Sequence, residues 1–200
     1  INTDSIHLLI FQFLQRTQIL FLNMSWGKLL QPNLVLPGTI LHLTPDLVQS
    51  HGLKGLVLDV DETLVPFRNS QVSEELLPWV EDIREVASLW LVSNNISEAR
   101  IRRIGKSLDV PYIAGAGKPS RRKVRRAVEA MQLPFHQVGM VGDRLFTDVL
   151  AGNRLNMFTI LVEPMVAPYQ TVRKSSIHSF EVWLSQALGA SLAPHSLKIK

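Results

Sequence analysis

Two aspartates at a spacing of two, Asp59 and Asp61, are the first residues in the sequence that could do chemistry. They follow an apolar run at 55–58 that is typical of a buried strand. Side chains two apart on an extended segment point the same way, so both carboxylates can face one small volume. Such a pair can supply a nucleophile, a proton donor or metal ligands. An acidic turn after a strand is also common, so the pair alone leaves a purely structural role open.

Further polar residues occur at similar places along the chain, each close to the end of a short apolar run or a glycine turn. In chain order they are Ser93, Asn94, Lys118, Asp143 and Asp148. Taken one at a time, these residue types are also common in turns and at helix caps. Their meaning therefore depends on how the elements between them are arranged.

Hydrophobic periodicity predicts those elements. Short apolar runs at 55–60, 88–93, 111–114, 137–141 and 158–162 predict strands. Apolar stripes between them predict helices, one through Ile101, Ile104 and Leu108 and one through Val124, Ala127, Val128 and Met131. Alternating strands and helices predict an α/β fold in which a parallel sheet is covered on both faces. Ligands of such sheets bind beyond the carboxyl ends of the strands, where these polar residues lie.

The order of the strand ends carries a family resemblance. Four successive ends present paired carboxylates, a hydroxyl, a lysine and then further carboxylates. This order resembles the haloacid dehalogenase-like (HAD) phosphatases, whose pattern is Asp-x-Asp-x-Thr, then Ser or Thr, then Lys, then Gly-Asp with a further Asp. The resemblance covers about residues 50–165 and fills every motif position. More narrowly, the motifs are similar to the YqeG-type branch of subfamily IIIA, which is related to the phosphatidylglycerophosphate phosphatases.

The resemblance implies a HAD-like, Rossmannoid three-layer fold with a parallel sheet. Cap domains of this superfamily enter after the first motif or between the second and third. Only residues 64–91 and 95–117 are available for such insertions here. We therefore expect no large cap domain and a site that is open to bulky phosphate esters.

The charges and the resemblance together imply a phosphatase mechanism. Asp59 is expected to be the nucleophile, forming an aspartyl-phosphate. Asp61 is expected to protonate the leaving alkoxide and later to accept a proton from water. An acid with this role needs a raised pKa, which we expect from crowding by other acids.

The same reasoning implies a cofactor and supporting residues. Acids that converge on a phosphate need a cation, so Mg²⁺ is expected on Asp59, Asp143 and the backbone carbonyl of Asp61. The expected phosphate-binding residues are Ser93, Asn94 and Lys118. Asp148 is expected to support the metal or Lys118, whereas Thr63 and Asn94 are interpreted as orienting groups.

Composition limits the other classes of function. The 200 residues include no cysteine, which excludes disulfides, thiolate zinc sites and cysteine nucleophiles. Lys and Arg exceed Asp and Glu by 21 to 17, giving a net charge of +4. The six histidines show no close ligand spacing.

The sequence predicts a single phosphatase domain at 51–190 with an apolar N-terminal extension at 1–50 and a basic tail at 191–200. The first methionine is Met24, so three interpretations of residues 1–23 stay open. They are an interfacial amphipathic helix, a packing helix, or a segment outside the native chain. Polar residues interrupt the apolar stretches of this segment, which argues against a membrane span.

Basic residues concentrate between positions 100 and 126. Ten Lys and Arg residues stand there against one acid, Asp109. Two interpretations stay open: solvated helix faces, or a surface that attracts an anionic partner. The expected location is cytoplasmic, with peripheral contact at the inner membrane face.

The leading hypothesis is a Mg²⁺-dependent phosphomonoesterase acting on an anionic phospholipid, with phosphatidylglycerophosphate as substrate. The first alternative is a cytoplasmic phosphatase of small metabolites or nucleic-acid ends; no specific nucleic-acid partner is expected. A receiver-type phosphorylation switch and a non-catalytic scaffold are further alternatives. The early Asp pair disfavours the switch, and the complete motif set disfavours the scaffold.

Overall fold

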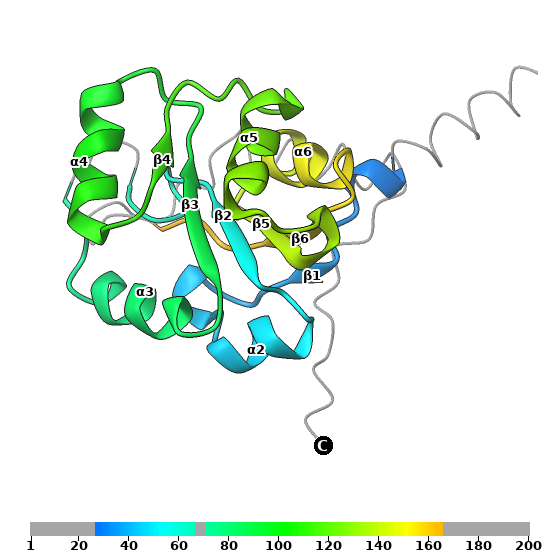
Figure 1. The fold of residues 1–200 in the computed structure, drawn as a ribbon, viewed down its shortest axis with the longest axis horizontal. Coiled ribbons are helices and arrows are strands. Elements are labelled where there is room, and N and C mark those ends of the chain that lie inside the picture. The colour runs from blue at the N-terminus through cyan, green and yellow to red at the C-terminus, as the bar shows by residue number, and fades with distance from the viewer. Residues whose placement is uncertain (1–26, 67–70, 166–200) are drawn as a thin grey trace, which may run out of the picture.

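A computed structural model describes residues 27–66 and 71–165. The predictions for residues 1–23 and for the tail at 191–200 lie outside these described residues. The described part is built around one sheet of six parallel strands in the order β1-β6-β5-β2-β3-β4 (Figure 1). The strands are β1 (Leu34–Val35), β2 (Gly55–Leu58), β3 (Ser88–Val92), β4 (Tyr112–Ile113), β5 (Val138–Gly142) and β6 (Phe158–Leu161).

Helices cover both faces of this sheet, as the periodicity predicted. The α-helices are α2 (Pro45–Ser50), α3 (Leu76–Arg84), α4 (Glu98–Leu108), α5 (Arg121–Met131) and α6 (Leu150–Asn153). Short 3₁₀ turns lie at η1 (Ile40–His42) and η2 (Phe135–Gln137), and a π-helical turn, η3 (Leu145–Val149), precedes α6. The α/β fold with a parallel sheet is therefore confirmed.

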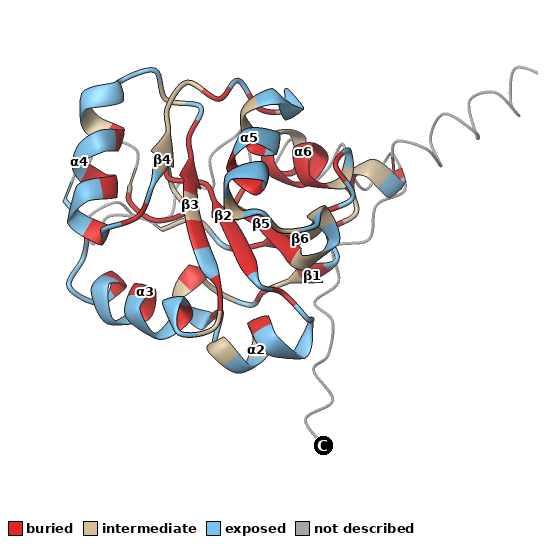
Figure 2. Ribbon diagram, viewed as in Figure 1, coloured by how far each residue is buried: buried red, intermediate tan, exposed pale blue. Residues whose placement is uncertain are grey.

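The central strand β2 shows how the sequence builds the two layers. Leu56 and Leu58 pack in one apolar cluster with α2, α3 and α4, whereas Val57 packs in another with α5 and α6. Successive side chains point to opposite faces of the sheet, and full burial of each is worth about 1.5–3 kcal/mol. Figure 2 shows the buried residues on the strands and on the inner sides of the helices.

The strand β1 was not predicted from the sequence. Two prolines, Pro32 and Pro37, interrupt this part of the apolar extension and leave it without a regular pattern. In the structure Leu34 and Val35 pair with Ile160 and Leu161 of β6 at the sheet edge. Prolines are tolerated beside an edge strand because few ladder hydrogen bonds are needed there. Part of the extension at 1–50 thus belongs to the same core.

The connections that could hold a cap domain are short. Within the described residues, the chain between β2 and β3 contains only α3, and the chain between β3 and β4 contains only α4. This agrees with the expectation of no large cap. Figure 1 shows the loop after β3, the loop after β4 and the start of α5 at one end of the molecule.

Candidate active site

The predicted site residues meet where the parallel strands end. Asp59 directly follows β2, Ser93 directly follows β3, Lys118 lies in the loop between β4 and α5, and Asp143 directly follows β5. All four residues are buried, with relative exposures between 0% and 6%. Buried polar groups need partners, so their contacts define the site.

Lys118 is the centre of the site. Its Nζ lies 2.5 Å from Asp59 Oδ1 and 2.7 Å from Asp148 Oδ1. The Lys118 and Asp148 side chains are each 1% exposed, and that of Asp59 is 9% exposed. Two carboxylates therefore flank the ammonium, one from the residue after β2 and one from η3.

Asn94 holds the backbone of this lysine. Its Nδ2 donates to the Lys118 carbonyl at 3.0 Å, and its Oδ1 accepts from the Lys118 N–H at 2.6 Å. These contacts fit the orienting role that the sequence suggested for Asn94. They give no support to its side chain as a direct phosphate ligand, because both polar ends are engaged with Lys118.

Asp148 contacts Lys118 directly, which favours one of the two roles expected for it. Its Oδ2 also accepts from the Arg144 N–H at 3.3 Å and from Thr147 Oγ1 at 3.1 Å. The π-helical turn brings these donors around the carboxylate. Asp148 is thus fixed by its own turn on one side and by the ion pair with Lys118 on the other.

Asp61 lies among hydrogen-bond donors. Ser93 Oγ donates to Asp61 Oδ2 at 2.9 Å, and Arg100 Nη1 donates to Asp61 Oδ1 at 2.6 Å. These two contacts of Asp61 are thus with a hydroxyl and a guanidinium, and neither of them is with another acid. The reason is geometric: the acids converge on Asp59 and Asp143, whereas Asp61 turns toward the first turn of α4.

Arg100 is the site residue that sequence reasoning missed. It was counted as one of the basic residues at 100–126, but its side chain is only 14% exposed and pairs with Asp61. Its position could have been found from the helix register. It is three residues after Ser97, the N-cap of α4, in the first helical turn after the Ser93 strand end.

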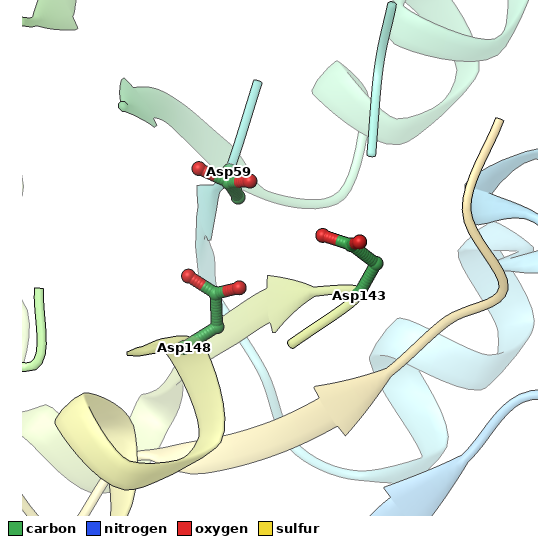
Figure 3. Close-up of side chains that lie close together, drawn as sticks. All are labelled: Asp59, Asp143 and Asp148. Atoms are coloured by element: carbon green, nitrogen blue, oxygen red, sulfur yellow. The ribbon is translucent and has the colours of Figure 1, made fainter. Parts of the chain in front are cut away.

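Thr63 and Asp143 form the remaining contact. Thr63 Oγ1 donates to Asp143 Oδ1 at 3.2 Å, and both residues are buried. Figure 3 shows the carboxyl groups of Asp59, Asp143 and Asp148 turned toward a common space. One oxygen from each of the three lies within 4.8 Å of the others.

Burial and repulsion between the carboxylates raise the pKa values of two aspartates in this cluster. Burial, together with the charge of Asp148, raises the pKa of Asp59 to about 7 against the opposing effect of Lys118. Burial and the charges of Asp148 and Asp59 also raise the pKa of Asp143 well above its usual value. Burial would lower the pKa of Lys118, but Asp148 and Asp59 outweigh it and raise that pKa.

A divalent cation fits this cluster by charge and by donor type. With Asp59, Asp143 and Asp148 ionised, one ammonium leaves two negative charges uncompensated. Carboxylate oxygens are the ligands that Mg²⁺ prefers in proteins. Burial first, and then the neighbouring carboxylates, raise the pKa of both Asp59 and Asp143, and a bound cation would oppose both effects.

Gly142 leaves the space that Asp148 occupies. A Cβ at position 142 would lie 2.4 Å from Asp148 Cγ, a distance that real side chains do not reach. We expect Gly142→Ala to displace Asp148 from Lys118 and to lower the phosphatase activity that the resemblance implies by about 10²-fold, the cost typical of a small misplacement. Steady-state kinetics of this variant and of Asp148→Asn would measure it; full activity of Gly142→Ala would show that Asp148 need not stay in place.

The basic residues at 100–126 do not form one uniform surface. Arg100 and Lys118 belong to the site, Arg102 pairs with Glu98, and Lys123 Nζ donates to the carbonyls of Ala114 and Gly115. Lys123 thereby fixes the loop that leads to Lys118. The remaining positive charge is divided between α4 and α5.

The chain is similar in sequence to known hydrolases and phosphatases. A family model described as HAD-hydrolase-like matches residues 115–178. The chain is 36% identical to a protein named probable phosphatase YqeG from Bacillus subtilis (strain 168), over 64% of this chain and 74% of that protein. It is 31% identical to the chloroplastic phosphatidylglycerophosphate phosphatase 1 of Chlamydomonas reinhardtii, over 88% of this chain and 72% of that protein.

The solved structure of NagD from E. coli K-12 also aligns with the chain. The TM-score is 0.46 at 14% sequence identity, over 60% of this chain and 94% of that one.

None of the helices within residues 27–66 and 71–165 combines the length and the apolar composition needed to cross a bilayer.

Proposed function

The chain belongs to the HAD-like hydrolases, in the group of phosphatases that includes YqeG, and from this membership we propose a Mg²⁺-dependent phosphomonoester hydrolase that works through an aspartyl-phosphate. The observation that carries the proposal is the buried contact of Lys118 with Asp59 beside the Asp143 and Asp148 carboxylates. A carboxylate nucleophile needs a nearby cation to approach an anionic phosphate, and this arrangement supplies one.

In the proposed first step, a carboxylate oxygen of Asp59 attacks the phosphorus. The bond from phosphorus to the ester oxygen breaks, and that oxygen leaves as an alcohol after it receives the proton of Asp61. Lys118 donates to the oxygens of the transferring phosphoryl group, and Ser93 does so once its hydroxyl turns from Asp61 to the bound phosphate. In the second step, water attacks the phosphorus while Asp61 accepts its proton, which releases phosphate and restores Asp59.

Asp59, Asp143 and the backbone carbonyl of Asp61 are the proposed ligands of Mg²⁺. When bound, the ion neutralises the charge of the carboxylates and of the phosphoryl oxygens. Thr63 orients Asp143 through its hydroxyl, and Asp148 orients Lys118 through their ion pair. Asn94 fixes the Lys118 backbone so that the ammonium reaches Asp59.

The Arg100–Asp61 contact gives the first prediction about this mechanism. Arg100→Gln removes the cation that orients Asp61, so proton transfer should become less efficient. We expect turnover of an alkyl phosphate to fall by about 10²-fold, within the range typical of general acid–base catalysis. Turnover of p-nitrophenyl phosphate should fall less, because its leaving group needs little protonation.

A matched control lies on the same helix. Arg102 pairs with Glu98 at the surface, and both side chains are more than half exposed. Arg102→Gln should keep both activities within about 2-fold, since exposed pairs contribute little. Equal losses on both esters in Arg100→Gln would instead assign Arg100 to substrate binding.

Mg²⁺ and protons should compete for the same carboxylates. In the metal-free protein the raised pKa of Asp59, about 7 against 3.8 for the ordinary group, means that the folded state holds a proton that the unfolded chain has lost. The free energy of unfolding therefore decreases as the pH rises from 3.8 to about 7. Mg²⁺ should reverse the loss, so we expect its increase in melting temperature to be larger at pH 8 than at pH 5.5. A smaller increase at pH 8, measured by thermal unfolding, would contradict Mg²⁺ binding at Asp59.

The proposed substrate is phosphatidylglycerophosphate, an anionic phospholipid that carries a terminal phosphomonoester. Support comes from the relative of Chlamydomonas reinhardtii, which is named phosphatidylglycerophosphate phosphatase 1. The short connections above the strand ends are consistent with a bulky substrate.

Phosphate release would test this function directly. Purified protein with Mg²⁺ is given phosphatidylglycerophosphate in mixed micelles or a panel of soluble esters, with Asp59→Asn as the blank. A strong preference for the lipid supports the proposed substrate. Turnover of soluble esters alone would support the proposed mechanism. It would contradict the lipid substrate and indicate small phosphorylated molecules instead.

A further inference from the structure

A surface pocket lined almost entirely by arginine lies outside the site described above. Its volume is about 520 Å³, and its lining residues come from α5, from the residue before α5 and from the residue after α6. They are Ser120, Arg121, Arg122, Arg125, Arg126 and Arg154. We call these residues the arginine pocket. Five positive charges around one cavity repel one another, so an anion in the cavity would be stabilised.

The contacts of the arginine pocket leave these charges uncompensated. Arg121 Nη1 donates to the Arg154 carbonyl at 3.3 Å, and Arg154 Nη1 donates to the Pro119 carbonyl at 3.2 Å. Arg125 lies 5.8 Å from the centre of the Phe135 ring. Within residues 27–66 and 71–165, no ion pair involves any arginine of the pocket. Carbonyls and a ring thus position three of the guanidinium groups without neutralising them.

Amphipathic packing explains why the arginines gather there. Val124, Ala127 and Val128 of α5 are buried against the sheet. The arginines at 121, 122, 125 and 126 occupy the exposed positions of the same helix. Guanidinium groups are well suited to phosphate oxygens because they donate through a planar fork.

The pocket adjoins the proposed catalytic site. Ser120 follows Lys118 by two residues, and Arg154 contacts the intervening Pro119. The start of α5 therefore lies at the end of the molecule where the strands terminate (Figure 1). An anionic surface held by the arginines would lie beside the opening of the site.

An exposed apolar side chain occurs at the same end. Ile96, in the loop after β3, is 90% exposed. The Gly115 N–H donates to the Asn95 carbonyl at 2.8 Å, which joins this loop to the one that carries Lys118. Basic residues at the same end of a molecule as an exposed apolar side chain are typical of surfaces that lie on anionic bilayers.

We propose that the arginine pocket binds the phosphate groups of an anionic lipid surface and that Ile96 inserts beside it, so that the opening of the catalytic site faces the lipid. The proposal rests on the proposed function in that a lipid substrate gives this docking its purpose. It differs from the general basic surface suggested by the sequence, because it assigns the contact to α5 and Arg154 rather than to the whole segment 100–126.

Vesicle co-sedimentation of the full chain tests the proposal. The vesicles contain phosphatidylcholine alone or with about one third phosphatidylglycerol, and the test variant is Arg122→Gln with Arg126→Gln. The control variant, Lys54→Gln with Lys106→Gln, removes the same charge at the opposite end of the strands, before β2 and in the last turn of α4. A third variant, Ile96→Ser, tests the apolar contact.

We expect binding to the anionic vesicles only. Each removed charge should weaken it by about 5-fold, from about 1 kcal/mol per basic residue near such a surface. The double pocket variant should therefore bind about 25-fold more weakly. The control variant should change binding by less than 2-fold, and Ile96→Ser should weaken it measurably. Equal weakening by pocket and control variants, or no binding by the unaltered chain, would overturn the proposal.

A second arm separates a lipid headgroup from a free phosphate. Inorganic pyrophosphate is titrated by calorimetry against the Asp59→Asn protein with and without the pocket substitutions. If pyrophosphate binding requires the pocket arginines and the vesicles do not bind, the lipid surface is contradicted. The ligand of the pocket would then be a soluble phosphate. Hydrolysis of p-nitrophenyl phosphate reports on the proposed function independently, and the pocket variant should retain it.

Discussion

Lys118→Met is expected to abolish phosphatase activity and to destabilise the protein by about 3–5 kcal/mol, the usual cost of removing one partner of a buried ion pair. The ammonium contacts both Asp59 and Asp148, whose side chains are at most 9% exposed. Methionine has a similar length but no charge. Both carboxylates would then be buried without a cation. Their negative charge would repel the phosphate group of the substrate.

A second substitution distinguishes charge imbalance from simple loss of packing. Adding Asp148→Asn to Lys118→Met removes one of the uncompensated carboxylates, so part of the stability should return. Chemical denaturation of the two single variants and the double variant gives this coupling energy. Additive losses of stability would show that the Lys118–Asp148 ion pair contributes nothing beyond packing.

Asp59→Asn is expected to lower turnover by at least about 10⁴-fold, since loss of a nucleophile removes the covalent route. The fold should persist, because the amide has nearly the shape of the carboxyl group. Lys118 keeps its ion pair with Asp148 in this variant. Steady-state assays with a soluble ester and with a lipid ester would both show the loss.

The stability of Asp59→Asn should differ from that of Lys118→Met. The pKa of Asp59, raised to about 7 by burial and by Asp148 against Lys118, makes its ionisation costly for the folded state above that pH. An amide avoids this cost. We expect the melting temperature of Asp59→Asn in metal-free buffer at pH 8 to equal or exceed that of the unaltered protein. A marked decrease would mean that the ion pair with Lys118 outweighs the cost of burying the charge.

The arrangement of the site could be predicted where it follows from strand ends. Asp59, Ser93 and Asp143 directly follow buried strands, and parallel strands bring such positions together. Lys118 was predicted from its place in the motif order, and the structure brings it to the same edge. Short apolar runs for the strands and a periodicity of 3.6 along the helices were sufficient for this much.

Other features depend on side-chain direction, which the sequence pattern does not contain. The pairing of Asp61 with Arg100 needs the first turn of α4 to face the end of β2. The contact of Asp148 with Lys118 needs the π-helical turn η3, which has no distinct sequence pattern here. The edge strand β1 has only two residues, too few for a periodic pattern. Likewise, the division of the basic segment between the site and the two helices depends on helix register in three dimensions.

The most direct test of the mechanism is to identify the residue that carries the phosphoryl group during turnover. The protein with Mg²⁺ is mixed with an activated phosphate ester, quenched in acid within milliseconds, digested and analysed by tandem mass spectrometry. We expect a phosphoryl group on Asp59 that is absent from Asp59→Asn and that disappears when the substrate is exhausted. A phosphoryl group on another residue, or phosphate release by Asp59→Asn at an undiminished rate, would contradict nucleophilic catalysis by Asp59.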